Sequence, residues 1–329
     1  QAQDAAQETF LKAVRLVLNG EVQDEVRQRF GVRSFSVDPK RGFFLNGRPY
    51  PLHGVSRHQD RKGLGNAITR EMHDEDMQLI KELGANTIRL AHYQHDQYFY
   101  DLCDEAGMVV WAEIPYISEH MPNGRENTIS QMKELIVQNY NHPSLVTWVI
   151  FNESWGVRNI FTDEAQSNLA TGLYYLTKSI DPMRPVISND GWMHAKSDIL
   201  TLHHYEQDGE KLYSFYDDVT KLTRGDVCNS QYLPYANGYA YEGQPIVMSE
   251  FGGTAYVRDE DAGWGYGCGV KSDEEFLSRF GGLIGAIERM HINGYCYTQI
   301  TDVEQEVNGL LKADRAPKVA LSEIAKRNR

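Results

Sequence analysis

The stretch Leu145-Val146-Thr147-Trp148-Val149-Ile150-Phe151-Asn152-Glu153 decides the fold. Its first seven residues are almost all apolar, which is typical of a parallel strand buried on both faces. Further short apolar runs follow the same pattern, and amphipathic helical segments separate them. That alternation predicts parallel strands joined by helices. The predicted strands are 50–56, 86–93, 108–115, 145–152, 185–189, 199–205, 245–251 and 294–300.

Eight strand–helix units fit a (β/α)8 barrel, that is a TIM barrel, better than a doubly wound sheet of five or six strands. Several helices can be phased from their apolar positions, and two of them end at Gly84 and Gly107. No GxGxxG pattern follows any predicted strand, so a dinucleotide site is not expected. The sequence therefore predicts an α/β protein whose main unit is a TIM barrel.

The first 36 residues have a different character. Val14, Leu16 and Leu18 alternate with polar residues before the turn-like pair Asn19-Gly20, and no crossover helix follows. This pattern predicts a β-hairpin. A few strands alone cannot bury a core, so Val14, Leu16, Leu18 and Val22 are expected to dock on the barrel flank. We expect two parts, 1–36 and the barrel 37–329.

The composition is that of a globular protein with an acidic balance. Lys and Arg number 33 against 46 Asp and Glu, which gives a net charge of −13. An acidic surface repels nucleic acid and anionic membranes, so neither is expected as a partner. The first 20 residues lack the pattern of a secretory leader, and no stretch has the length of a membrane span. The four cysteines lack metal spacing, which favours a reducing, cytoplasmic compartment, with a secreted or periplasmic location left open.

Two glutamates follow predicted strands directly. Glu153 ends the strand quoted above, and Glu250 follows the apolar run 246–248 in Ser249-Glu250-Phe251. Either one alone could cap a helix or lie in a surface loop. The βα loops form the mouth of a barrel, however, and these two strands lie three positions apart, so the carboxylates should face one another across it. Such a pair is what glycosidic bond cleavage requires.

Six motifs occur in order along the chain: Arg57-His58-Gln59-Asp60, Asn86–Tyr93, His142-Pro143-Ser144, Phe151-Asn152-Glu153, Ser249-Glu250-Phe251-Gly252 and Asp314-Arg315-Ala316-Pro317-Lys318. Together they make the sequence from about residue 42 to 318 resemble the catalytic barrel of glycoside hydrolase family 2. This family includes β-galactosidases, β-glucuronidases and β-mannosidases. The segment 16–35 resembles the last strands of the immunoglobulin-like β-sandwich that precedes the barrel there. The rest of the sandwich and a jelly-roll domain are missing, so accessory domains or a homo-oligomer are possible partners.

The resemblance implies a role for each matching residue. Glu153 would be the general acid/base and Glu250 the nucleophile of a retaining mechanism. Asn152 would hold the sugar 2-hydroxyl, and Arg89 and Tyr205 would hydrogen-bond Glu250. Structural roles remain as alternatives. Arg89 could be a buried barrel arginine with a carboxylate partner, and aromatic residues near the strand ends, such as Tyr205, could belong to the core. The resemblance also implies that Asp60 grips hydroxyls of the sugar and that His58, His92 and Tyr297 line its pocket. Apart from the resemblance, Trp192 lies near the same strand ends and could stack on a sugar face.

The expected activity is that of an exo-β-glycosidase releasing terminal β-D-galactosyl residues, with β-glucuronidase or another family 2 activity as the alternative. Glucuronidases of the family bind the sugar carboxylate with an Asn-x-Lys motif, which lies a few residues before Asp-Arg-x-Pro-Lys in the sequence. Counting back from Asp314 places Glu306 and Asn308 at those two positions. An anionic Glu306 and a neutral Asn308 should disfavour a glucuronide.

No metal or other cofactor is expected. The family's large β-galactosidases carry metal ligands after the third strand, including a Glu and a His. Here that stretch reads Trp111-Ala112-Glu113-Ile114-Pro115, and Glu119 and His120 follow in a different spacing. The alternatives from other classes are a carbohydrate-binding barrel without catalytic power and an NAD-dependent barrel oxidoreductase. The five polar residues Glu153, Glu250, Arg89, Asn152 and Tyr205 argue against the first, and the missing glycine pattern argues against the second.

Overall fold

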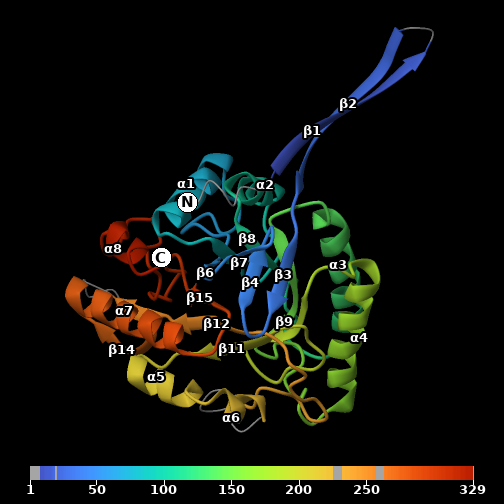
Figure 1. The fold of residues 1–329 in the computed structure, drawn as a ribbon. Helices are drawn as coiled ribbons and strands as arrows, with labels where there is room; N and C mark the ends of the chain where they lie inside the picture. The colour runs from blue at the N-terminus through green and yellow to red at the C-terminus, as the bar shows by residue number, and fades with distance from the viewer. Residues whose placement is uncertain (1–7, 19–20, 225–231, 257–262, 329) are drawn as a thin grey trace.

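The computed structural model describes residues 8–18, 21–224, 232–256 and 263–328, with side chains from residue 31 onward. Eight parallel strands form one sheet in the order β10-β9-β8-β7-β6-β15-β12-β11 (Figure 1). The two ends of that order meet, because Asp198 N donates to Val186 O at 2.9 Å and His203 N donates to Gly191 O at 3.3 Å. The predicted TIM barrel is confirmed.

Each predicted barrel strand overlaps an observed one. They are β6 (Leu52–Arg57), β7 (Thr87–Leu90), β8 (Val109–Glu113), β9 (Leu145–Asn152), β10 (Val186–Asp190), β11 (Leu200–His204), β12 (Ile246–Gly252) and β15 (Gly294–Thr298). Every residue of β9 is buried. A strand enclosed by barrel and helices leaves no face for water, which is why its sequence is nearly all apolar.

Helices cover the outside of the barrel (Figure 1). Asp96 accepts a hydrogen bond from Tyr98 N at the start of α2, and Gly107 ends that helix in the left-handed conformation with φ 70°. None of the helices in the described ranges is both long and apolar enough to cross a membrane. The helices are α1 (Arg70–Glu82), α2 (Gln97–Ala106), α3 (Pro122–Asn139), α4 (Glu164–Ile180), α5 (Gly209–Tyr216), α6 (Val219–Thr223), α7 (Asp273–Arg289) and α8 (Leu321–Ala325).

A small antiparallel sheet closes the amino-terminal end of the barrel. It consists of β3 (Phe35–Asp38), β4 (Gly42–Leu45) and β5 (Arg48–Pro49). Phe43 and Leu45 pack in one cluster with Trp111, Val146 and other residues near the amino ends of the barrel strands. This end of the barrel is therefore sealed with apolar side chains, and only the opposite end can open to substrate. A further short pair, β13 (Thr254–Tyr256) and β14 (Tyr266–Val270), lies after β12.

The predicted N-terminal hairpin is present as β1 (Glu8–Leu18) and β2 (Glu21–Val32), paired antiparallel. Figure 1 shows the two strands extending away from the barrel. Arg33, which follows β2, joins the pair to the barrel by donating to Pro143 O at 2.6 Å and to Leu145 O at 2.8 Å. The side chains of Val14, Leu16, Leu18 and Val22 lie outside the part that the structure describes, so their docking on the barrel flank stays a prediction. The boundary at residue 36 also stays a prediction.

Candidate active site

Arg89 organises the mouth of the barrel from strand β7. Its side chain is completely buried, and its guanidinium meets four partners. It forms ion pairs with Glu250, with Glu113 at 2.5 Å and with Asp190 at 2.9 Å, and Nη2 donates to Asn152 Oδ1 at 2.7 Å. The planar group fixes several acceptors at once. The carboxylate partner expected for Arg89 is therefore present.

Glu250 lies near the end of strand β12, two residues before Gly252, and both of its carboxylate oxygens accept hydrogen bonds. Arg89 donates to Oε1, and the Tyr205 hydroxyl donates to Oε2. Burial alone would raise the pKa of Glu250, but the positive charges of His203, Arg89 and His92 outweigh burial and lower it to about 2. The group is thus a carboxylate at neutral pH, as a nucleophile must be.

Glu153 follows strand β9 on the opposite side of the opening. Its backbone has φ 50°, and its N–H donates to Asp190 O at 3.0 Å. The next residue is fixed as well, because Ser154 N donates to Asn189 Oδ1 at 2.8 Å. Unlike Glu250, the Glu153 side chain keeps 24% of its surface exposed. It can therefore exchange protons with water or a leaving group.

The two carboxylates lie close together. One oxygen of Glu153, one oxygen of Glu250 and one ring nitrogen of His203 all lie within 4.8 Å of one another. Retaining glycosidases place their carboxyl groups about 5–5.5 Å apart, and inverting ones about 6.5–9.5 Å apart, to admit a water. The spacing fits retention.

His203, on β11, is a member of this site that the sequence did not reveal. Its Nδ1 donates to Glu153 Oε1 at 2.8 Å and lies 3.6 Å from Glu250 Oε2, while Nε2 lies 3.4 Å from Asp190 Oδ2. Burial opposes the charged form, but Glu250 and Asp190 prevail and raise the pKa of His203 to about 10. An imidazolium therefore lies between the two carboxylates. Gly191 makes room for it, since a Cβ there would lie 2.6 Å from Nδ1.

His203→Gln should move the acidic limb of the kcat/KM–pH profile to higher pH. The wild-type imidazolium lowers the pKa of Glu250, so removing that positive charge raises this pKa, and Glu250 becomes protonated at a higher pH. His204→Gln is the matched control, because His204 turns to the other face and meets the Tyr216 hydroxyl at 2.9 Å. An acidic limb that stays in place in His203→Gln would contradict this account.

Asp60 lies beside the opening, in the loop after β6. Its Oδ1 is buried without a hydrogen-bond partner among the described residues, and burial raises the pKa of its carboxyl, against the effect of Arg315 and Arg57. Arg315 donates to Asp60 O at 2.5 Å and to Asp76 Oδ1 at 3.0 Å. Arg57 pairs with the same Asp76 at 2.7 Å. Two of the quoted motifs thus meet in a buried ion-pair network that positions Asp60.

His58, His92 and Glu306 form the neighbouring wall. The rings of His58 and His92 lie edge to face at 5.1 Å. His92 Nδ1 donates to Glu113 Oε2 at 3.0 Å, and this carboxylate raises the pKa of His92 although burial alone would lower it. Burial and nearby positive charge lower the pKa of His58 to about 3, so its ring is neutral. Asn308 donates to Glu306 Oε1 at 2.9 Å, and burial, with the Glu250 charge, raises the pKa of Glu306.

The last two residues predicted to bind substrate, Trp192 and Tyr297, lie in different surroundings. Trp192 is half-buried, stacks on Tyr232 at 4.4 Å and meets His203 edge-on at 5.8 Å. Tyr297 is only 1% exposed, and its ring packs against Phe251 and Phe280. The structure gives Tyr297 a packing position behind the site, and a direct contact with substrate there stays a prediction.

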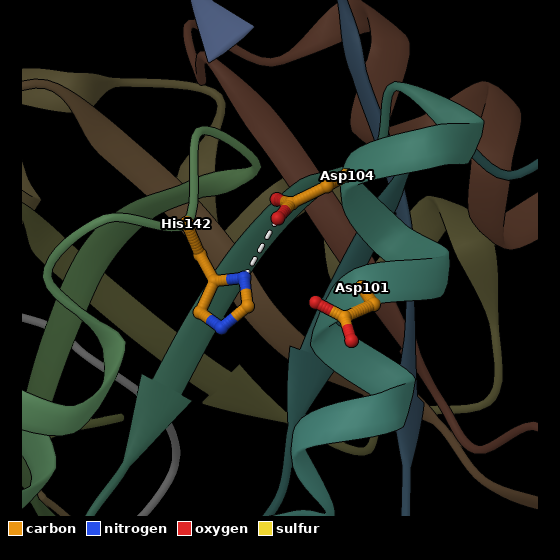
Figure 2. Close-up of side chains that lie close together, drawn as sticks. All are labelled: Asp101, Asp104 and His142. Carbon is orange, nitrogen blue, oxygen red and sulfur yellow. Dashed lines mark hydrogen bonds and ion pairs between the residues drawn. The ribbon is translucent and has the colours of Figure 1, made fainter. Parts of the chain in front are cut away.

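Two further places in the described part of the chain carry side chains of the types that ligate metal ions. Glu113, which the family resemblance brings closest to a metal position, is already engaged by Arg89 and His92, so the residues do not fit an ion there. Figure 2 shows a second group, Asp101, Asp104 and His142, away from the mouth. His142 donates to Asp104 Oδ2 at 2.7 Å, and Ser144 N donates to Asp104 Oδ1 at 2.9 Å. The His-Pro-Ser motif therefore anchors the loop before β9.

A TIM barrel with two facing carboxylates at its mouth, one held by an arginine, is the architecture of a retaining glycoside hydrolase. Comparison with known proteins agrees. The family model described as "Glycosyl hydrolases family 2, TIM barrel domain" matches residues 37–258, and the chain belongs to this family.

Several individual proteins of known name or structure are similar to this chain. A protein of Bacteroides fragilis named beta-glucuronidase is 39% identical over 220 residues, which are 62% of this chain and 30% of that protein. The human beta-glucuronidase is 30% identical over 251 residues, which are 71% of this chain and 35% of the human one. An FMN-binding beta-glucuronidase from Facaelibacterium prausnitzii L2-6 superposes with TM-score 0.75 and 32% identity, covering 96% of this chain and 50% of that one. The chain thus spans about a third of the length of these curated relatives.

Proposed function

We propose that the barrel is a retaining exo-β-glycosidase that removes terminal non-reducing β-glycosyl residues by double displacement. The observation that carries this proposal is the closeness of the Glu153 and Glu250 oxygens, which lie within 4.8 Å of each other. This separation suits covalent catalysis and is shorter than the one that an inverting mechanism needs to place its attacking water.

The two glutamates divide the chemistry. The Glu250 carboxylate attacks the anomeric carbon, while Glu153 in its protonated form gives its proton to the leaving oxygen. Glu250 then carries the sugar as an ester and has lost its negative charge. Glu153, now a carboxylate beside the His203 imidazolium, removes a proton from the incoming water, and the ester is cleaved with net retention.

The glycone has two candidates. The names of the relatives favour a β-glucuronide over the β-galactoside expected from the sequence. The β-galactoside is favoured by the name of one solved structure, a putative beta-galactosidase from Bacteroides fragilis. That structure is 28% identical to this chain and superposes with TM-score 0.75. The names alone leave the sugar undecided within the family.

The local charges support a neutral hexoside, with β-galactoside first. Glu306 lies close enough to the nucleophile for the Glu250 charge to raise its pKa, and Asn308 stands where the glucuronidase motif has lysine. The nearby Lys318 is committed to Asp302 at 2.6 Å. A uronate carboxylate would add a further negative charge beside Glu306 without a new cation to meet it. We estimate a cost on the order of 1 kcal/mol or more in a partly desolvated site.

Hydrolysis of nitrophenyl β-glycosides tests this proposal. We expect kcat/KM on the β-galactoside to exceed that on the β-glucuronide. The double variant Glu306→Asn with Asn308→Lys should raise kcat/KM on the glucuronide by about tenfold, since a charge is reversed in the pocket. Glu304→Gln, which removes an exposed acid from the same loop, is the control and should give a much smaller gain. A wild-type preference for the glucuronide would establish the second candidate instead.

A further inference from the structure

We propose that Trp155 and Tyr116 form the subsite that binds the leaving group. This subsite binds a ring-shaped aglycone by stacking on the flat apolar face of the aglycone ring. The inference rests on the proposed glycosidase function and adds a binding site to it. Its ligand is a sugar ring or an aryl group attached through the oxygen that Glu153 protonates.

Two large aromatic rings are left open to solvent at this place. Trp155 is 38% exposed and Tyr116 is 53% exposed, and their ring centroids lie 5.5 Å apart with an interplanar angle of 47°. The Arg158 guanidinium lies 4.4 Å from the centroid of the Trp155 ring. Arg158 thus lies over the Trp155 ring, and the surface of the two rings that stays exposed is a small aromatic patch of the kind that binds ring-shaped ligands.

The backbone holds this pair in place. Trp155 N donates to Asn152 O at 2.9 Å and Val157 N donates to Ser154 O at 3.0 Å, so the acid/base loop is a tight turn. Gly156 has φ 81°, and a Cβ there would lie 2.3 Å from Ile117 Cγ1. The loop after β9 therefore packs closely on the loop after β8, which carries Tyr116. Rings on two fixed loops lose little conformational freedom when a ligand binds.

The position assigns the pair to the leaving group. Trp155 lies two residues beyond Glu153, the group that protonates the leaving oxygen. The glycone side of the site is built from other elements: Asp60 after β6, His92 after β7 and Glu306 after β15. A ring that stacks on Trp155 would hold the leaving oxygen beside Glu153, and an alcohol bound there would be placed to attack the glycosyl-enzyme.

Reactivation of a trapped glycosyl-enzyme tests acceptor binding at this subsite separately from formation of the glycosyl-enzyme. The enzyme is labelled with a 2-deoxy-2-fluoro β-glycoside of the preferred sugar and freed of excess reagent. Recovery of activity is then followed in buffer and with increasing phenyl β-D-glucoside. In the second case an acceptor hydroxyl oxygen bonds to the anomeric carbon, the ester bond to Glu250 breaks, and the hydroxyl proton passes to Glu153.

We expect phenyl β-D-glucoside to accelerate wild-type reactivation with saturation. In Trp155→Ala the concentration giving half the maximal acceleration should rise about tenfold, with a smaller rise in Tyr116→Ala and partial recovery in Trp155→Phe. Tyr175→Ala is the matched control, because Tyr175 is a 58% exposed aromatic on α4 and should leave the acceptor dependence unchanged.

An acceptor dependence in Trp155→Ala and Tyr116→Ala that equals the wild-type one would overturn the subsite while leaving the glycosidase intact. Failure of every 2-fluoro glycoside to label the enzyme would overturn the proposed function first. Circular dichroism of each variant checks that its fold is retained.

Discussion

Replacing Glu250 with glutamine should abolish hydrolysis, with kcat falling at least about 10⁴-fold. An amide oxygen is a poor nucleophile and cannot form the glycosyl ester. The replacement keeps the size of the side chain and an oxygen that can accept from Tyr205 or Arg89. The loss of rate therefore reports the missing carboxylate. Initial rates on an activated nitrophenyl glycoside measure it.

Covalent labelling gives the same assignment an independent test. A 2-deoxy-2-fluoro glycoside should attach to wild-type protein, and mass mapping of its peptides should find the sugar on Glu250. Glu250→Gln should take up no label, while Tyr175→Ala serves as the control for intact protein. A label on Glu153 would reverse the two roles.

The barrel could be predicted because each of its strands is buried on two faces. Strand β9 shows this best: its observed bounds, Leu145–Asn152, are those expected from the sequence. The three-stranded sheet at the amino-terminal end was not expected. Its strands have two to four residues, too few for alternation to show, and Phe43 has a reason to be apolar only once the barrel end it fills exists.

The candidate site could be predicted where a residue ends a strand or belongs to a motif. Glu153, Glu250, Arg89, Asn152 and Tyr205 come together as expected. Their substrate roles stay predictions.

His203, Asp190 and Glu113 were missed as parts of the site, because their importance lies in contacts between strands distant in sequence. One signal for His203 was available. It lies two residues before Tyr205 at the end of the same strand, so alternation turns both side chains to one face. The same alternation correctly sends His204 to the other face.

Replacing Glu153 with alanine should slow substrates with poor leaving groups most. The acid supplies a proton to the departing oxygen, and a dinitrophenyl group departs with little need of it. We expect kcat/KM on an alkyl β-glycoside to fall by about 10³-fold or more, and kcat/KM on a dinitrophenyl glycoside far less. A plot of log kcat/KM against leaving-group pKa should therefore steepen in the variant.

Azide completes the test, because Glu153→Ala also lacks the base for the second step. The glycosyl ester on Glu250 is then hydrolysed slowly. Azide needs no deprotonation and can enter the space left by the Glu153 carboxylate, so it can attack the ester in place of water. Added azide should raise kcat on the dinitrophenyl glycoside by about tenfold or more and yield a β-glycosyl azide, since attack occurs on the face that Glu153 occupied. Wild-type protein should gain nothing from azide. An α-glycosyl azide, or no rescue on the activated substrate, would rule out Glu153 as the acid/base. Either result would also rule out the double displacement inferred from carboxylate oxygens that lie within 4.8 Å of each other.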